Sequence, residues 1–348
     1  MSVRALESTE IDDFRADPVR LDLAQPDPGL RDPDRFQRAD AGSAIGTDAA
    51  HLALRTAQDL CAQSLQVGLF CRGPGLASYW REHVRDWRQA VPVHTGRFGD
   101  YALRLGVRGT RKPARAEGRQ AADDGALDGA DLVRLLRIAE KLPEHLRLDA
   151  LVLHEAADFT ELEWDVLRAL LRRPRGHEAP ADRIHAYAGG AAPVVAEGTS
   201  VSFHACFTDD AEDLASDCAS ALLREGWRKD QIAVLTTGNP HPLHEANLWD
   251  AGTPADYWTA CHEGDEEFYG LVREFKGLER PAVVLCVNGF DDSSSAAEQM
   301  RMGMSRARSR LMVVGNPATI EAAAGSAVVA ALRSPAHLGA DPRPLCGG

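Results

Sequence analysis

The sequence predicts an α/β fold with parallel sheets, and three observations lead to this prediction. Short apolar runs recur along the chain, each about long enough for one buried strand: VGLFC, LDALVL, IAVLT and PAVVLCV. Segments of helical period lie between them. The chain has 348 residues, of which 44% are hydrophobic, enough for two packed domains. Strands that alternate with helices over the whole length favour parallel sheets covered on both faces.

The first half of the chain is expected to hold an arm and one lobe. Residues 1–40 are rich in Asp, Pro and Arg without a clear period, which predicts an irregular N-terminal arm. Residues 41–195 are expected to form a lobe that opens with a helix from Ala49 and has strands at VGLFC, VPVH, LDALVL and DRIHAY. In TELEWDVLRALL, Thr160 and Glu163 stand at capping-box spacing, so another helix is predicted to begin there.

The second half is expected to form a separate lobe. Small residues cluster between Gly190 and Gly198, and we place the boundary there. Residues 196–330 then carry strands at VSFHACF, IAVLT, PAVVLCV and LMVVG, and residues 331–348 form a tail. The stretch GTRKPARAEGRQAADDGALDGAD, from Gly109, is poor in apolar residues and is expected to be a surface loop.

Charge and cysteine content narrow the class of protein. The net charge of −13 weighs against tight, non-specific binding of nucleic acid by the whole surface. No apolar run approaches the ~18 residues of a membrane helix, so no membrane partner is expected. The seven cysteines form no C-x-x-C pair, which argues against a zinc site or a disulfide framework. With no apolar signal segment in MSVRALESTEIDDFRADP, a cytoplasmic location is expected.

The stretch SAIGTDAAHLALRTAQDL, from Ser43, has the form of a loop that leads into an apolar helix. A phosphate-binding loop ends in Gly-Lys-Ser/Thr at such a place, because backbone N–H groups and a lysine must hold phosphates there. Here the triplet is Asp48, Ala49 and Ala50. The first lysine of the chain is Lys112, so no other register of the preceding residues supplies the ammonium group.

Two later segments carry the most specific pattern: REFKGLERPAVVLCVNGF, and then QMRMGMSRARSRLMVVGNP. They resemble motifs V and VI of the UvrD/RecB-like superfamily-1 helicases, whose pattern is roughly FKGLE-x-x-x-V-I-L and then Y-V-[AG]-[LT]-[ST]-R-A-[RK]-x-x-L. The matching residues are Lys276, Gly277, Leu278, Glu279, Gly303, Ser305, Arg306, Ala307, Arg308 and Leu311. The resemblance implies a P-loop NTPase fold with two RecA-like parallel-sheet lobes.

Other segments occur in the order of that family. DALVLHEAADF resembles the Walker B region DALVVDEAQDF, and VPVHTGRFGDYAL resembles a strand end that contacts single-stranded DNA. The resemblance covers residues 43–317, and the gaps between motifs are too short for large accessory domains, which implies a minimal core. The nucleic-acid contacts that it implies are Thr95 and Arg273, the latter standing where the family has a histidine.

The resemblance shows which phosphate-handling residues are replaced in the first lobe. Gly46, Thr47, Asp48, Ala49 and Ala50 align with the family's Gly-Thr-Gly-Lys-Thr. The lysine and the magnesium-holding threonine thus become alanines. A carboxylate in this loop would also repel phosphate, by about 4 kcal/mol at ~4 Å and an effective dielectric constant of about 20. Binding of Mg-ATP in the usual pose is therefore not expected.

The Walker B-like segment is altered in the same way. His154 stands where the family has its magnesium-binding aspartate, and imidazole is a poor ligand for a hard cation. Glu155 keeps the position of the catalytic base, whereas Ala157 replaces the glutamine that senses the γ-phosphate. A different metal site made of His154, Glu155 and Asp158 is disfavoured, because adjacent residues after a strand point in different directions.

The second lobe keeps more of the family's residues. Lys276 and Gly277 lie at nucleotide-binding positions, Glu279 matches the ribose contact, and Arg306 matches the arginine finger that stabilises transferring phosphate. The segments KGLE and SRAR also close the sheet of the lobe. A role as fold scaffold therefore stays open beside a role in nucleotide binding.

Three functions follow as expectations. The first is a UvrD-like helicase-fold protein that has lost ATP hydrolysis, needs no cofactor and acts as a binding or regulatory module. Its partner would be another protein, such as a helicase or nuclease component, or a single DNA strand. The second is a divergent ATP-dependent DNA helicase that uses Mg-ATP, with Glu155 and Arg306 as catalytic residues. The third is a nucleic-acid binder without nucleotide, whose binding would depend strongly on salt.

Overall fold

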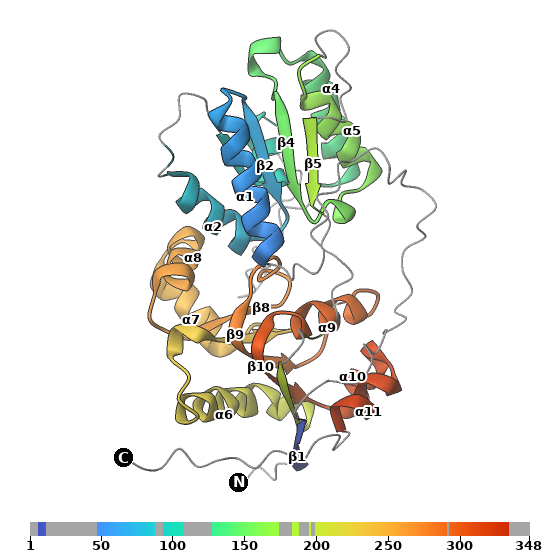
Figure 1. The fold of residues 1–348 in the computed structure, drawn as a ribbon. Helices are drawn as coiled ribbons and strands as arrows, with labels where there is room; N and C mark the ends of the chain where they lie inside the picture. The colour runs from blue at the N-terminus through green and yellow to red at the C-terminus, as the bar shows by residue number, and fades with distance from the viewer. Residues whose placement is uncertain are drawn as a thin grey trace. The chain divides into compact units, whose positions relative to one another are not determined.

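The computed structural model describes residues 6–11, 47–85, 87, 93–106, 127–173, 183–187, 195, 199–290 and 292–333 (Figure 1). The chain divides into two compact units. The four-strand unit consists of Asp27–Ala191 together with Lys276–Leu278. The six-strand unit consists of Met1–Pro26, Ala192–Phe275 and Glu279–Gly348. Most of the predicted surface loop from Gly109 lies outside the described residues.

The four-strand unit contains an all-parallel sheet in the order β3-β2-β4-β5. In register, Val67 of β2 lies opposite Val93 of β3 on one side and Ala150 of β4 on the other. The strands are β2 (Val67–Cys71), β3 (Val93–Arg97), β4 (Ala150–His154) and β5 (Ile184–Tyr187). The helices are α1 (Thr47–Ala62), α2 (Pro74–Arg85), α3 (Phe98–Arg104), α4 (Gly129–Lys141) and α5 (Glu161–Leu170).

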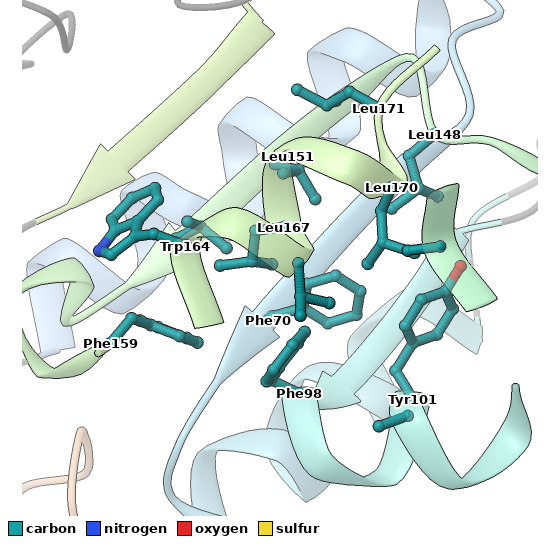
Figure 2. Packing of buried hydrophobic residues seen from close by; sticks show 14 of the residues in the cluster. Phe70, Phe98, Tyr101, Leu148, Leu151, Phe159, Trp164, Leu167, Leu170 and Leu171 are labelled. Atoms are coloured by element: carbon teal, nitrogen blue, oxygen red, sulfur yellow. The ribbon is translucent and has the colours of Figure 1, made fainter. Parts of the chain in front are cut away.

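The apolar runs VGLFC and ALVLH form the two central strands, and every one of their residues is buried. This is the pattern expected of parallel strands that helices cover on both faces. On one face, Phe70 and Leu151 pack with side chains of α3, α4 and α5, such as Tyr101 and Leu167, as Figure 2 shows. The strand VPVH of the prediction is the β3 strand of the structure, which runs from Val93 to Arg97.

The predicted capping box at the start of α5 is confirmed. The Thr160 hydroxyl accepts a hydrogen bond from the Glu163 N–H, and the Glu163 carboxylate accepts one from the Thr160 N–H. These two bonds satisfy N–H groups that a helix start otherwise leaves unpaired. They fix the turn between β4 and α5, where several candidate site residues lie.

The six-strand unit contains a mixed sheet in the order β1-β6-β10-β9-β7-β8, parallel except for β1. The strands are β1 (Leu6–Ile11), β6 (Ser200–Ala205), β7 (Ile232–Thr236), β8 (Phe268–Leu271), β9 (Arg280–Val287) and β10 (Ala307–Gly315). The helices are α6 (Ala211–Arg224), α7 (Pro242–Ala251), α8 (Pro254–Glu263), α9 (Ala296–Met304), α10 (Pro317–Ala324) and α11 (Ser326–Arg333).

Helix α6 covers one face of this sheet. Its buried residues, Leu222 among them, pack against Val234 of β7 and Val284 of β9. The strand residues between these, such as Val283 and Leu285, are also fully buried, so the sheet is covered on its other face as well. The sequence thus predicts the α/β class with parallel sheets correctly for both units.

Three details differ from the sequence-based expectation. The arm expected to be irregular contains β1, which pairs antiparallel with β6, forms one edge of the sheet and belongs to the six-strand unit. Strand β8 was not predicted, because FYGL is short and lies among charged residues. The tail expected from residue 331 begins inside α11, which ends at Arg333. In the part of the chain described here, no helix combines the length and apolar character needed to cross a membrane.

Candidate functional site

The four-strand sheet has a topological switch point between β2 and β4. After β2 the chain crosses to β3 on one side, and after β4 it crosses to β5 on the other side. In open α/β sheets, ligands bind outside the carboxyl ends of the strands at such a point. The turns after Cys71 and after His154 are therefore the place for a ligand site. Their charged side chains are those of Arg72, Glu155 and Asp158.

Glu155, directly after β4, has a left-handed backbone conformation with φ 54° and ψ 49°. Among the described residues, Ser64 is the other non-glycine residue with positive φ. This conformation costs a residue with a Cβ atom roughly 1–2 kcal/mol. Such strain is found preferentially at functional sites. It turns the chain sharply from β4 into the short helix η4 (Ala156–Asp158).

Lys276 brings a positive charge to this turn from far along the sequence. Its ammonium nitrogen lies 2.5 Å from Oδ2 of Asp158 and 3.7 Å from Oε2 of Glu155. The side chains of Lys276 and Glu155 are 16% and 14% exposed, so this pair is largely withdrawn from water. We call Glu155, Asp158 and Lys276 the ion triad. Two carboxylates that could otherwise face a cationic ligand are here bound to an internal ammonium group.

The backbone around Lys276 packs closely on the same strand ends. Gly277 has φ +82°, and a Cβ atom there would lie 2.7 Å from Leu76 and 3.2 Å from the His154 ring. A Cβ on Gly73, after β2, would lie 2.5 Å from the Lys276 carbonyl oxygen. Both positions thus need glycine. The KGL part of the helicase-like motif is held at the switch point by this fit.

His154, the last residue of β4, is almost fully buried. Its ring meets the Trp80 ring edge-on, with centroids 5.9 Å apart. Its Nδ1 lies 3.9 Å from Oε2 of Glu155. The imidazole thus fills space between α2 and the ion triad, in the position where the resemblance places a magnesium-binding acid.

Arg72, directly after β2, ties the turn to α5. One terminal nitrogen donates to the Asp158 carbonyl oxygen and to the Glu163 carboxylate, both at 2.6 Å, and the guanidinium lies over the Phe159 ring. The sequence prediction missed Arg72. The signal available was its place directly after a buried parallel strand, at the same edge as Glu155.

Cys71, beside Arg72, does not supply a nucleophile. Burial raises the pKa of its thiol far above the usual value, and the charge of Glu155 raises the pKa further. A thiol with so high a pKa stays protonated at neutral pH. None of the six cysteines in the described part of the chain forms a disulfide.

The residues aligned with the phosphate loop stand at the start of α1. Gly46 lies outside the described residues, and Thr47 and Asp48 form the first backbone positions of the helix. Ala49 and Ala50 are buried in the core, and the Ala50 carbonyl oxygen accepts a hydrogen bond from Trp80 Nε1 at 3.3 Å. These two alanines act as packing residues.

The other predicted contacts of the helicase-like motifs belong to the six-strand unit. Arg306 precedes β10, is 8% exposed, and donates to the Met302 carbonyl oxygen and the Ser305 hydroxyl. Glu279 precedes β9, and its carboxylate accepts a hydrogen bond from Arg308 Nε at 2.9 Å. Both side chains therefore make contacts that stabilise their own unit.

The two predicted nucleic-acid contacts lie in different units. Thr95 is in the middle of β3 in the four-strand unit and is nearly buried, and its hydroxyl oxygen has no hydrogen-bond partner among the described residues. Arg273 follows β8 in the six-strand unit and is half-buried. Because the Thr95 side chain is nearly buried, it is poorly accessible to a nucleic acid.

The residues at the switch point do not fit Mg-ATP. Magnesium requires oxygen ligands in near-octahedral geometry. Here a buried imidazole replaces one acid, and the carboxylates of Glu155 and Asp158 face the ammonium group of Lys276. No group of three His, Cys, Asp or Glu side chains suited to a metal occurs in the described ranges.

Comparison with protein-family models finds no matching family, and comparison with curated proteins finds no matching relative. The likeness to UvrD-type helicases thus depends on the two sequence motifs and on the order of the others.

Proposed function

We propose that this chain is a helicase-like protein of the UvrD type, with two RecA-like lobes, that does not hydrolyse ATP and acts as a binding or regulatory module. The observation that carries the proposal is the ion triad. Lys276 belongs to the KGLE segment, and its ammonium group is bound by Asp158 and Glu155 of the Walker B-like turn. In an active ATPase of this type, the corresponding lysine and acids would face the nucleotide and its metal ion. In this chain they are paired with each other.

Three further observations support the proposal. Ala49 and Ala50 are packing residues, His154 is buried against Trp80, and Arg306 donates to the carbonyl oxygen of Met302 in the preceding helix α9. Each stands at a position where the helicase family handles phosphate or metal. In each case the side chain takes part in contacts within its own unit, which suits a protein that keeps the fold and binds a partner. The partner is another protein, such as a helicase or nuclease component, or a single DNA strand.

The alternative is a divergent ATP-dependent DNA helicase. Glu155 favours it, because the residue keeps the position of the catalytic base and has a strained backbone. For this function to hold, Lys276 would have to leave the carboxylates when Mg-ATP binds.

Calorimetry with Mg-ATP, together with a turnover assay with and without single-stranded DNA, separates the two functions. The proposal expects neither binding heat nor turnover from the full chain. It expects the same of Lys276→Ala, because removing the ammonium group does not restore a phosphate loop. DNA-stimulated hydrolysis that Arg306→Ala abolishes would establish the alternative and overturn the proposal.

If neither Mg-ATP binding nor ATP turnover is found, a second experiment tests whether the partner is single-stranded DNA. It measures DNA binding over a series of salt concentrations. A steep salt dependence would indicate contact with the phosphate backbone. Binding that is absent at low salt would direct the search to protein partners.

A further inference from the structure

The opposite edge of the four-strand sheet holds a cavity of about 360 Å³. It lies where the last turns of α4 and α5 meet the amino ends of β4 and β5, whereas the ion triad lies at the carboxyl ends of these strands. We call it the arginine pocket. Its lining residues are Glu140, Arg147, Arg168, Ala169, Leu171, Arg172, Arg173 and Arg183. Figure 2 shows the side chain of Leu171 beside Leu170 and Leu148, in the core beneath this end of the unit.

Arg147 has a structural role in the pocket. Its guanidinium donates to the carbonyl oxygens of Glu140, Leu142 and Ala169, which belong to the ends of α4 and α5. Helix ends leave such carbonyl groups without intrahelical partners, and a cation suits the negative end of the helix dipole. Hydrogen bonds to neutral carbonyl oxygens do not cancel the charge of Arg147. The pocket keeps a buried positive charge at its base.

Two acids partly offset the charges of Arg147, Arg172 and Arg173. Asp149 lies 2.9 Å from Arg172 Nη1. The exposed carboxylate of Glu144 lies 3.3 Å from Arg147 Nε and 3.8 Å from Arg173 Nε, so two guanidinium groups share it. The Arg173–Glu144 pair is solvent-exposed on both sides, and an exposed pair of this kind contributes little stability.

Among the described residues, no acid is paired with Arg183, and Arg168 has only an exposed partner. Arg168 is half exposed and pairs with Asp165, one helical turn away on the surface. Arg183 donates from Nη2 to the Arg172 carbonyl oxygen at 2.8 Å. Its Nε is buried, and this nitrogen has no hydrogen-bond partner among the described residues. A buried N–H without a partner is destabilising, and an anion in the pocket would remove this cost.

We propose that the arginine pocket binds a phosphate group. Planar guanidinium forks match the oxygens of phosphate, and several arginines can share one tetrahedral dianion. The lining has five arginines and one carboxylate, Glu140, and Glu144, Asp149 and Asp165 pair with four of these arginines from outside the lining. Among the described residues, five guanidinium groups thus stand against four carboxylates, a balance that still favours an anion. It contains no aromatic ring on which a base could stack. The group recognised is thus the phosphate itself, carried by a small phosphomonoester or by the 5′ end of a nucleic-acid strand.

Binding to the full chain tests this proposal with two kinds of probe at one fixed ionic strength. Calorimetry uses inorganic phosphate and thymidine monophosphate. Fluorescence anisotropy uses one labelled oligothymidylate with a 5′-phosphate or a 5′-hydroxyl end. Arg168→Ala combined with Arg183→Ala should weaken binding of the phosphate probe at least about tenfold. Arg134→Ala, an exposed arginine of α4 outside the lining, is the matched control and should change nothing.

The outcomes distinguish the sources of the phosphate. Binding of both small probes supports a phosphomonoester site. Binding of the 5′-phosphorylated strand about tenfold tighter than the 5′-hydroxyl strand supports a strand-end site. Equal binding of both strands, equal binding of an acidic peptide without phosphate, no binding of any probe, or indifference to the arginine variants would overturn the proposal. Arg168→Glu, at a half-exposed position, repeats the test without a risk to folding.

Discussion

The two sheets of this protein have the same kind of switch point but different chemistry at it. In the four-strand unit, charged residues directly follow β2 and β4, and the left-handed Glu155 is part of the ion triad. The charge of Lys276 comes from more than a hundred residues along the chain. This edge is held by long-range ion pairs and by close backbone contacts at Gly73 and Gly277.

In the six-strand unit, the corresponding switch point lies between β7 and β9, because β7 leads to β8 and β9 leads to β10. Its strand ends are joined by hydrogen bonds of amides and hydroxyls. Asn288 accepts from the Gly238 N–H and donates to Glu212 and to the Asn239 carbonyl oxygen, while Thr237 donates to Gly289.

The two edges differ in the kind of contact that closes them. The network around Asn288 uses all the hydrogen-bonding groups of its amide inside the unit, and its role is to close the sheet end. The ion triad pairs charges that another charged group could displace, next to a strained residue. The proposed function therefore depends on the four-strand edge, and the variants below test this contrast.

The largest effect is expected for Asn288→Ala. The change removes three hydrogen bonds and leaves the Gly238 N–H and the Glu212 carboxylate without this partner, at a cost of about 4 kcal/mol in the free energy of unfolding of the six-strand unit. Hydrogen exchange of peptides from β7 and β9 measures this loss, and peptides from β2 and β4 are the control. If Asn288→Ala lowered the free energy of unfolding of its unit by less than Lys276→Ala lowers that of the four-strand unit, the comparison between the two edges would be reversed.

Acid should destabilise the six-strand unit through His244. Burial, followed by the charges of Arg273 and His241, lowers the pKa of this histidine from 6.5 to about 4. The folded state favours the neutral form of His244. The resulting contribution to the free energy of unfolding is complete above pH 6.5 and is lost as the pH falls toward 4. The loss is about 3 kcal/mol. Urea denaturation from pH 7 to 4 should show a shallower decline for His244→Leu, and equal slopes would contradict the assignment.

Lys276→Ala is expected to cost the four-strand unit about 1–2 kcal/mol, because Asp158 and Glu155 lose a largely buried ammonium partner. Reduced protection of β2 and β4 amides against hydrogen exchange measures the loss. Lys229→Ala is the matched control, since Lys229 pairs with Glu266 at 2.6 Å on the exposed surface of the six-strand unit. That control should leave stability unchanged, and an equal effect of both variants would show that the ion triad is an ordinary surface cluster.

The smallest effect is expected for Glu155→Gly. Relief of the left-handed backbone should stabilise the four-strand unit by up to about 1 kcal/mol, reduced by the loss of the contact with Lys276. Ser64→Gly relieves the same conformation at an exposed position outside the site and is the control. Thermal unfolding compares the two. If Glu155→Gly destabilises the unit more than Lys276→Ala does, the strain is not stored in this turn.

Much of the fold could be predicted from the sequence, because its central strands are continuous apolar runs. VGLFC, LDALVL, IAVLT and PAVVLCV each became a buried parallel strand, and Thr160 with Glu163 formed the predicted cap. The edge strand β1 was missed, since pairing with β6 is a long-range event that its polar sequence does not signal. Of the candidate site, Glu155, His154 and Lys276 were named from motifs, but Arg72 was not.

The sequence by itself determined the α/β class and the positions of the buried strands, because burial period and side-chain chemistry are local properties. The tertiary structure alone decided that Lys276 binds Asp158 and Glu155, and that five arginines from separate segments share one pocket. Both results depend on which strand ends and helix ends meet in space. That meeting is set by sheet order and packing, which no stretch of neighbouring residues encodes.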